Sequence, residues 1–167
     1  MHFIHDTLAD GGRLRVLTDF DTYTRECVAL EAASSFRGAD VARILAGAGR
    51  TRGGLPPRIR VDDGTEFTSK ALDAWAYWNR EELVFSRPGK PVDNAYADNA
   101  TVRRACLSQH WFRDLMDARE ILGRWKEEYN NERPHSSLGL ETPARYRAGQ
   151  TGDANRIEAQ ELAELPG

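Results

Sequence analysis

The sequence predicts one α/β domain in which strands and helices alternate around a single core. Two patterns indicate this: short segments with alternating apolar residues, which are typical of half-buried strands, and longer segments with apolar residues three or four positions apart, which are typical of helices. This order favours parallel pairing of the later strands, with ligands at their carboxyl ends. The length of 167 residues, 40% of them hydrophobic, suffices for one domain of ordinary size.

A hairpin is expected near the start of the chain. Apolar residues alternate with polar ones from Leu14 to Phe20, directly after the turn residues Gly11 and Gly12. The segment CVALEA, residues 27–32, predicts a second strand after a short connection. The two strands therefore pair as neighbours in one sheet.

A helix is expected next, from about residue 38. Val41, Ile44, Leu45 and Ala48 share one helical face, behind the candidate caps Ser35 and Asp40. The glycine-rich segment 47–57 ends this helix, because glycine is a poor helix former.

A strand, a helix and a further strand follow. RIRVDD, residues 58–63, predicts a short strand, and Thr68 is the expected cap of a helix that carries Leu72 and Ala76. LVFS, residues 83–86, is apolar with β-branched and aromatic content, so it predicts another strand.

The remainder of the chain is expected to be mainly helical. One long helix begins at Leu115 and is ended by Pro134; its apolar face consists of Leu115, Ala118, Ile121, Leu122, Trp125 and Tyr129. The four tryptophans, at positions 75, 78, 111 and 125, are expected to pack in the core, with base stacking as the alternative. Residues 1–147 form the predicted domain, and residues 148–167 form a polar tail.

Composition limits the classes of function. The net charge is −3, so any affinity for nucleic acid must come from a local cluster of Arg and Lys. Cys27 and Cys106 are too few for a disulfide framework and lack zinc-site spacing, which predicts buried thiols in a reducing cytosol. No segment resembles a membrane span or a signal peptide, so we expect a cytoplasmic protein without a membrane partner.

A pair of carboxylates stands at the end of a predicted strand. Asp62 and Asp63 follow the strand residues IRV and precede Gly64, where α/β sheets build their sites. Phosphoryl transfer by two divalent metal ions needs such hard oxygen ligands. The alternative is an Asp-Asp-Gly turn whose acids cap the next segment.

Several segments resemble integrase-core transposases of bacterial insertion sequences. IRVDDGTEFTS, residues 59–69, looks like the family's second-aspartate segment, and 35 residues separate Asp62 from Asp98, as between the family's second and third acids. RPGKPVDNAY, residues 87–96, and YNNERPHSSLGLETPARY, residues 129–146, are similar to the approach to the third acid and to the C-terminal signature. The resemblance runs from residue 1 to about residue 147. It implies an RNase H-like three-layer domain, with a mixed sheet flanked by helices, that cleaves DNA and transfers the strand with Mg²⁺ or Mn²⁺.

The resemblance places the catalytic roles on His2, Asp62 and Asp98, with Asp62 and Asp98 as metal ligands. The family's first acid is an aspartate in a phrase like Met-Asp-Phe, and this chain has Met1-His2-Phe3. Imidazole suits transition metals better than Mg²⁺ and brings no negative charge. Asp98 stands where the family has glutamate, so its carboxylate is shorter by about 1.5 Å, a misplacement that costs about 100-fold in rate.

Each of these residues also has an ordinary explanation. His2 fits a surface histidine without a ligand role. Asp6, Asp19 and Asp21 are the nearest substitutes for the lost acid, and each fits a solvated charge at a strand edge. Glu66 fits a position near the start of a helix, where the helix dipole favours a negative charge.

The candidates for phosphate contact are Arg87, Lys90, Arg103 and Arg104; ordinary surface positions are the alternative. The stretch after Asp98 is two residues shorter than in the family, which turns Arg103 and Arg104 by about 200° relative to the metal site. The chain starts within the first strand, without an upstream helix-turn-helix. We therefore expect a truncated copy without sequence-specific DNA recognition.

The sequence predicts a transposase or integrase catalytic core, impaired in this copy, for metal-dependent DNA strand cleavage and strand transfer. Its expected partners are DNA and either further copies of itself or an intact transposase. The first alternative is a catalytically inactive remnant that acts as a DNA-binding or partner-interaction module. The second is a different metal-dependent nuclease on the same fold, which would hydrolyse DNA without strand transfer.

Overall fold

The structure is a computed structural model that describes residues 1–86 and 93–150, with the side chains of residues 93–98 outside the description. Its elements in chain order are β1 (His2–Thr7), β2 (Arg13–Phe20), β3 (Cys27–Ala33), α1 (Gly38–Arg52), β4 (Arg58–Val61), α2 (Lys70–Asn79), β5 (Glu82–Phe85), α3 (Asp93–Ala105), η1 (Leu107–Gln109), α4 (Leu115–Asn131) and η2 (Ser136–Leu138). Residues 143–150 are also helical. The predicted tail lies mostly outside the described residues, so the boundary at residue 147 stays a prediction.

The strands form two sheets that meet at the start of the chain. β1, β2 and β3 pair in this order and antiparallel, with His2 opposite Thr18, while β4 and β5 pair in parallel, with Ile59 opposite Leu83. The amino group of Met1 donates a hydrogen bond to the carbonyl oxygen of Arg60, which joins β4 to β1. The predicted hairpin and the predicted parallel pair are confirmed, whereas the alternation pattern does not predict β1.

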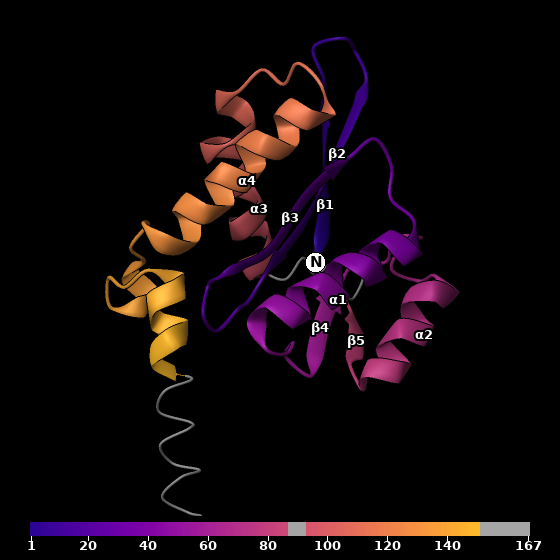
Figure 1. Ribbon diagram of the computed structural model, residues 1–167, viewed down its shortest axis with the longest axis vertical. Helices are drawn as coiled ribbons and strands as arrows, with labels where there is room; N and C mark the ends of the chain where they lie inside the picture. Colours follow the sequence, from indigo (N-terminus) through magenta and orange to yellow (C-terminus); the bar gives the residue numbers. More distant parts are fainter. Residues whose placement is uncertain (87–92, 151–167) are drawn as a thin grey trace, which may run out of the picture.

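Helices cover both faces of the strands in three layers, with α1 and α2 on one side and α3 and α4 on the other (Figure 1). The core is accordingly in two parts. One lies between the sheet and α3 and α4, around Val16, Leu122 and Trp125, and the other lies towards α1 and α2, around Leu17, Phe67 and Leu72. The predicted three-layer α/β class is confirmed.

The helices start and end at residues that satisfy their free backbone groups. In α1 the side chain of Asp40 accepts from the amide of Arg37, the N-cap, and Gly53 ends the helix with a φ of 77°. Ser35 is therefore not the cap, and the helix runs through Gly47 and Gly49 to Arg52. Ser69, and not the predicted Thr68, caps α2 by accepting from the amide of Leu72.

The face of α4 and both thiols lie where the sequence predicts them. Leu122, Trp125 and Tyr129 are buried against the sheet, and Cys27 of β3 and Cys106 are buried in the same core. The tryptophan prediction is wrong for Trp78 and Trp111, whose side chains are each 80% exposed. In α2 this is because only the narrow stripe of Leu72 and Ala76 is buried. Within residues 1–86 and 93–150, no helix is long and apolar enough to cross a membrane.

Candidate active site

His2 and Asp62 come together from neighbouring strands. His2 opens β1 and Asp62 directly follows β4, so the carboxylate stands at the carboxyl end of its strand, as the sequence predicts. His2 Nδ1 lies 3.6 Å from Asp62 Oδ2, and the two side chains are 24% and 29% exposed. Two of the predicted site residues, His2 and Asp62, are thus in direct contact.

The Asp62 carboxylate is held in a tight turn. Its Oδ1 accepts a hydrogen bond from the amide of Gly64 at 2.8 Å, and the carbonyl oxygen of Gly64 accepts from the amides of Phe67 and Thr68. Burial acts to raise the pKa of Asp62, but the contact with His2 and the Gly64 amide outweigh it and hold the pKa below 3.8. The turn expected as the alternative is present, and it presents an ionised carboxylate beside His2.

Helix α3 is tied to the sheet next to His2 through Asn99. The hydroxyl of Thr18, which lies opposite His2 in the sheet, donates to Asn99 Oδ1 at 2.6 Å and is also 3.2 Å from the carbonyl oxygen of His2. Asp98 precedes Asn99 in α3, and its side chain lies outside the description. The sequence pattern does not single out Asn99, since 81 positions separate it from Thr18.

The described donors do not fit a centre of two magnesium ions. Such a centre needs several carboxylate oxygens, and His2 and Asp62 supply one imidazole and one carboxylate. In the described part of the chain, no group of three or more His, Cys, Asp or Glu side chains converges. His2 Nε2 is enclosed and has no hydrogen-bond partner among the described residues. An imidazole carries no negative charge, so the contact between His2 and Asp62 supplies a single carboxylate.

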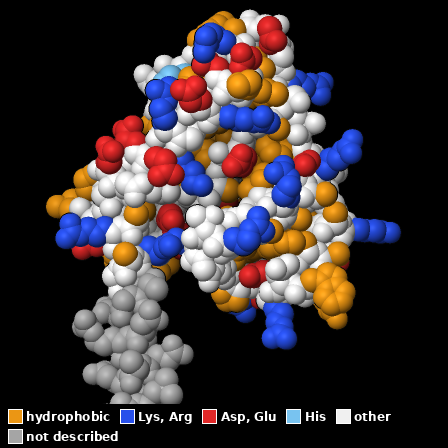
Figure 2. Space-filling view, viewed as in Figure 1, with side chains coloured by type: hydrophobic (Ala, Val, Ile, Leu, Met, Phe, Trp, Pro, Cys, Tyr) orange, Lys and Arg blue, Asp and Glu red, His pale blue; other side chains and the backbone are white. Residues whose placement is uncertain are grey.

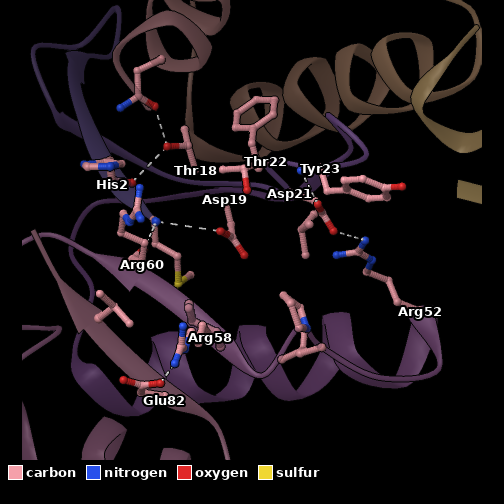
Figure 3. Close-up of a pocket in the computed structure, with 18 residues that line it drawn as sticks. His2, Thr18, Asp19, Asp21, Thr22, Tyr23, Arg52, Arg58, Arg60 and Glu82 are labelled. Atoms are coloured by element: carbon pink, nitrogen blue, oxygen red, sulfur yellow. Dashed lines mark hydrogen bonds and ion pairs between the residues drawn. The ribbon is translucent and has the colours of Figure 1, made fainter. Parts of the chain in front are cut away.

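Asp19 and Asp21, two of the expected substitutes for a first acid, have other partners. Asp19 lies 3.8 Å from the Met1 amino group, and Asp21 pairs with Arg52 at 2.8 Å. Each side chain is only 15% exposed, so the expectation of solvated strand-edge charges is wrong for both. They line a cavity of about 520 Å³ that His2 borders (Figure 3).

The structure describes two of the four candidate phosphate contacts. Arg103 donates to the carbonyl oxygen of His5 at 3.1 Å, and Arg104 donates to that of Ala100 at 3.3 Å; both lie on the exposed side of α3. Arg87 and Lys90 lie outside the described residues. Figure 2 shows positive and negative side chains interspersed on the face it displays, in keeping with the small net charge. The DNA-binding roles of Lys90, Arg103 and Arg104 stay predictions.

The antiparallel strands β1–β3, the parallel pair β4–β5 and the helices on both faces make this chain a three-layer α/β protein with Asp62 at the carboxyl end of β4. Two family models described as "Integrase core domain" match residues 1–91 and 79–143. The chain belongs to the integrase core family.

Relatives from insertion sequences agree with the predicted type of protein. The chain is 41% identical over 163 residues to "Insertion element IS407 uncharacterized 31.7 kDa protein" of Burkholderia multivorans. The match covers 96% of this chain and 58% of that protein. It is 40% identical over 158 residues to "Insertion element IS476 uncharacterized 39.2 kDa protein" of Xanthomonas euvesicatoria. This match covers 93% of the chain and 45% of that protein. The chain thus spans about half the length of these curated relatives, and the predicted insertion-sequence, integrase-core type is confirmed.

Solved structures confirm the fold. The chain of a simian T-cell lymphotropic virus intasome in complex with PP2A regulatory subunit B56 gamma matches with a TM-score of 0.72 and 12% identity, over 87% of this chain and 52% of that one. The HTLV-2 integrase catalytic core domain in complex with magnesium, in its trimeric form, matches with a TM-score of 0.69 and 10% identity, over 87% and 92%. The RNase H-like α/β fold is therefore that of the retroviral integrase cores.

Proposed function

We propose that the chain is the catalytic core of an insertion-sequence transposase whose lineage chemistry is metal-dependent DNA strand cleavage and strand transfer, and that this copy is impaired. One observation supports the impairment: His2, which the resemblance places at the family's first acid, lies 3.6 Å from Asp62. Two divalent ions need anionic ligands to offset their charge, and a neutral imidazole offers none.

The roles proposed for the site follow the family's order of acids. Asp62 and Asp98 are the metal ligands, with Mg²⁺ or Mn²⁺ as the cofactor, and His2 takes the place of the missing carboxylate. The HTLV-2 core domain named above was solved with magnesium, which supports this choice of cofactor. Because Asp98 is also shorter than glutamate, both outer ligand positions depart from the family's pattern.

Nicking of a labelled DNA duplex in Mg²⁺ or Mn²⁺ tests the proposal. We expect no nicking by the native chain, nicking by the double variant His2→Asp with Asp98→Glu, and none when Asp62→Ala is added to that variant. Nicking by the native chain that Asp62→Ala abolishes would show an intact site and overturn the impairment. If neither the native chain nor any variant nicks the duplex, that result would argue against a catalytic core in this chain.

A second candidate function is a DNA-binding or partner-interaction module without chemistry, which the replacement of an acid by His2 also favours. DNA affinity should then fall steeply with salt and persist in Asp62→Ala. If Arg103 or Arg104 binds a phosphate, replacing it by Gln should lower the salt slope by about 1. Further copies of the chain or an intact transposase are the proposed protein partners, as the HTLV-2 core has been solved in dimeric and trimeric forms. A cytoplasmic location is proposed with either function.

A further inference from the structure

The segment that carries Asp62 is anchored to the sheet at a point distant in sequence. It runs from the end of β4 to Ser69, the cap of α2, through the turn at Gly64. The orientation of the Asp62 carboxylate therefore depends on where residues 62–69 lie against the sheet.

Arg15 provides this anchor from β2. Its Nη1 pairs with Glu66 Oε1, and its guanidinium lies over the ring of Phe3, 4.2 Å from the centroid. The side chains of Arg15 and Glu66 are only 20% and 12% exposed, so solvent screens this pair less than a surface pair. Arg15 Nε is enclosed without a hydrogen-bond partner among the described residues. In the described structure, Glu66 is therefore the carboxylate with which the Arg15 guanidinium pairs.

The ring of Phe3, beneath Arg15, connects the strand that bears His2 with the segment that bears Asp62. Phe3 follows His2 in β1, and its ring centroid lies 5.1 Å from that of Phe67, which is fully buried one position after Glu66. The Glu66 carbonyl oxygen also accepts from Ser69 Oγ at 2.8 Å. The same few residues thus contact the strand that bears His2 and the segment that bears Asp62.

We propose that Arg15 and Glu66 form a positioning pair that sets the orientation of Asp62 relative to β1. The proposal rests on the proposed function of Asp62, and neither Arg15 nor Glu66 contacts the reacting groups in it. Removing the guanidinium would leave the mostly buried Glu66 carboxylate without its cation, so Glu66 would turn towards solvent and move the turn at Gly64.

Arg15→Met tests the pair, because methionine keeps an apolar stem over Phe3 and removes the charge. Arg52→Met is the matched control: Arg52 is 10% exposed and pairs with Asp21 and Glu26, away from the turn. Both variants should lower the midpoint of thermal unfolding. Only Arg15→Met should shift the NMR signals of the Gly64 amide and the Asp62 carboxyl carbon, and Arg15→Lys should restore part of the shift. Unchanged Gly64 and Asp62 signals in Arg15→Met, or equal changes in Arg52→Met, would overturn the proposal.

Nicking kinetics give a second readout in the His2→Asp, Asp98→Glu background. Arg15→Met should lower kcat about 10- to 100-fold with little change in KM for DNA, since the defect is in orientation. Arg52→Met should lower kcat much less than Arg15→Met does, because Arg52 does not contact the turn that holds Asp62. A kcat unaffected by Arg15→Met would contradict the positioning role. If that background does not nick at all, the proposed function fails, while the NMR comparison still decides the positioning pair.

Discussion

Helix α4 and the β4–α2–β5 unit are attached to the central strands in different ways. The apolar face of α4 packs on the sheet, and three polar side chains of α4 donate to the backbone of the edge strand β3. Arg119 Nε bonds the Ala32 carbonyl oxygen at 2.9 Å, Lys126 Nζ bonds that of Val28 at 2.9 Å, and Asn130 Nδ2 bonds that of Cys27 at 3.0 Å. The attachment is spread along the whole helix and also protects an edge strand.

The β4–α2–β5 unit, which carries Asp62, shares an apolar core with β2 and α1, and a few specific contacts between distant residues fix its position there. The start of α1 approaches the start of α2 so closely that only a glycine fits at residue 38. Arg15 pairs with Glu66, and the Met1 amino group bonds the Arg60 carbonyl oxygen. Single substitutions should therefore shift the β4–α2–β5 unit more than they shift α4.

The largest effect is expected from Gly38→Ala, where α1 meets α2. A Cβ at residue 38 would overlap Ser69 Oγ and lie 2.9 Å from the Glu66 carbonyl oxygen. Overpacking and a disturbed cap should lower the free energy of unfolding by about 3 kcal/mol in urea denaturation. Gly123→Ala is the control, because a Cβ at this position of α4 meets nothing within 4 Å. It should stabilise by up to about 1 kcal/mol, and equal effects of the two variants would break the comparison.

Asn130→Ala tests the attachment of α4. The buried Asn130 amide accepts from the Cys27 amide at 2.8 Å and donates to the Cys27 carbonyl oxygen. Loss of both bonds should cost about 2 kcal/mol of unfolding free energy. Asn131→Ala shares the change in helix propensity, but the hydrogen bonds of Asn131 to described residues stay within α4, at Glu127. It should change stability by less than about 0.5 kcal/mol, and a similar loss in both variants would contradict the role of Asn130.

The smallest effect concerns the pair of Asp21 and Arg52. Burial acts to raise the pKa of Asp21, but the hydrogen bond from Arg52 and two backbone amides outweigh it and hold the pKa below 3.8. A carboxyl whose pKa is lower in the folded state stabilises the fold above its unfolded pKa, and this stability is lost as the pH falls through the folded pKa. Asp21→Asn should therefore cost about 1 kcal/mol near pH 6 and almost nothing in strong acid, as urea denaturation at several pH values would show. In an Arg52→Gln background the cost near pH 6 should largely vanish; a cost that persists there would assign it to other contacts.

Local patterns were sufficient for much of the fold and for one site residue. The helical face of α4, the β2–β3 hairpin and the position of Asp62 after β4 follow from spacing within short segments, because side-chain direction repeats with the period of a helix or strand. The exposure of Trp78 does not follow, since helical spacing alone leaves open how wide a stripe of α2 the neighbouring elements bury.

By itself, the sequence determined the α/β class, most of the elements and the kinds of donors present at the site, including the imidazole of His2. Only the tertiary structure decided that His2 contacts Asp62, that Asn99 bonds Thr18 across 81 positions and that Arg15 reaches Glu66 across 51. The physical reason is that each of these contacts joins elements whose own residue patterns are already satisfied locally. Their partners are therefore chosen by how the packed layers bring distant strands and helices together.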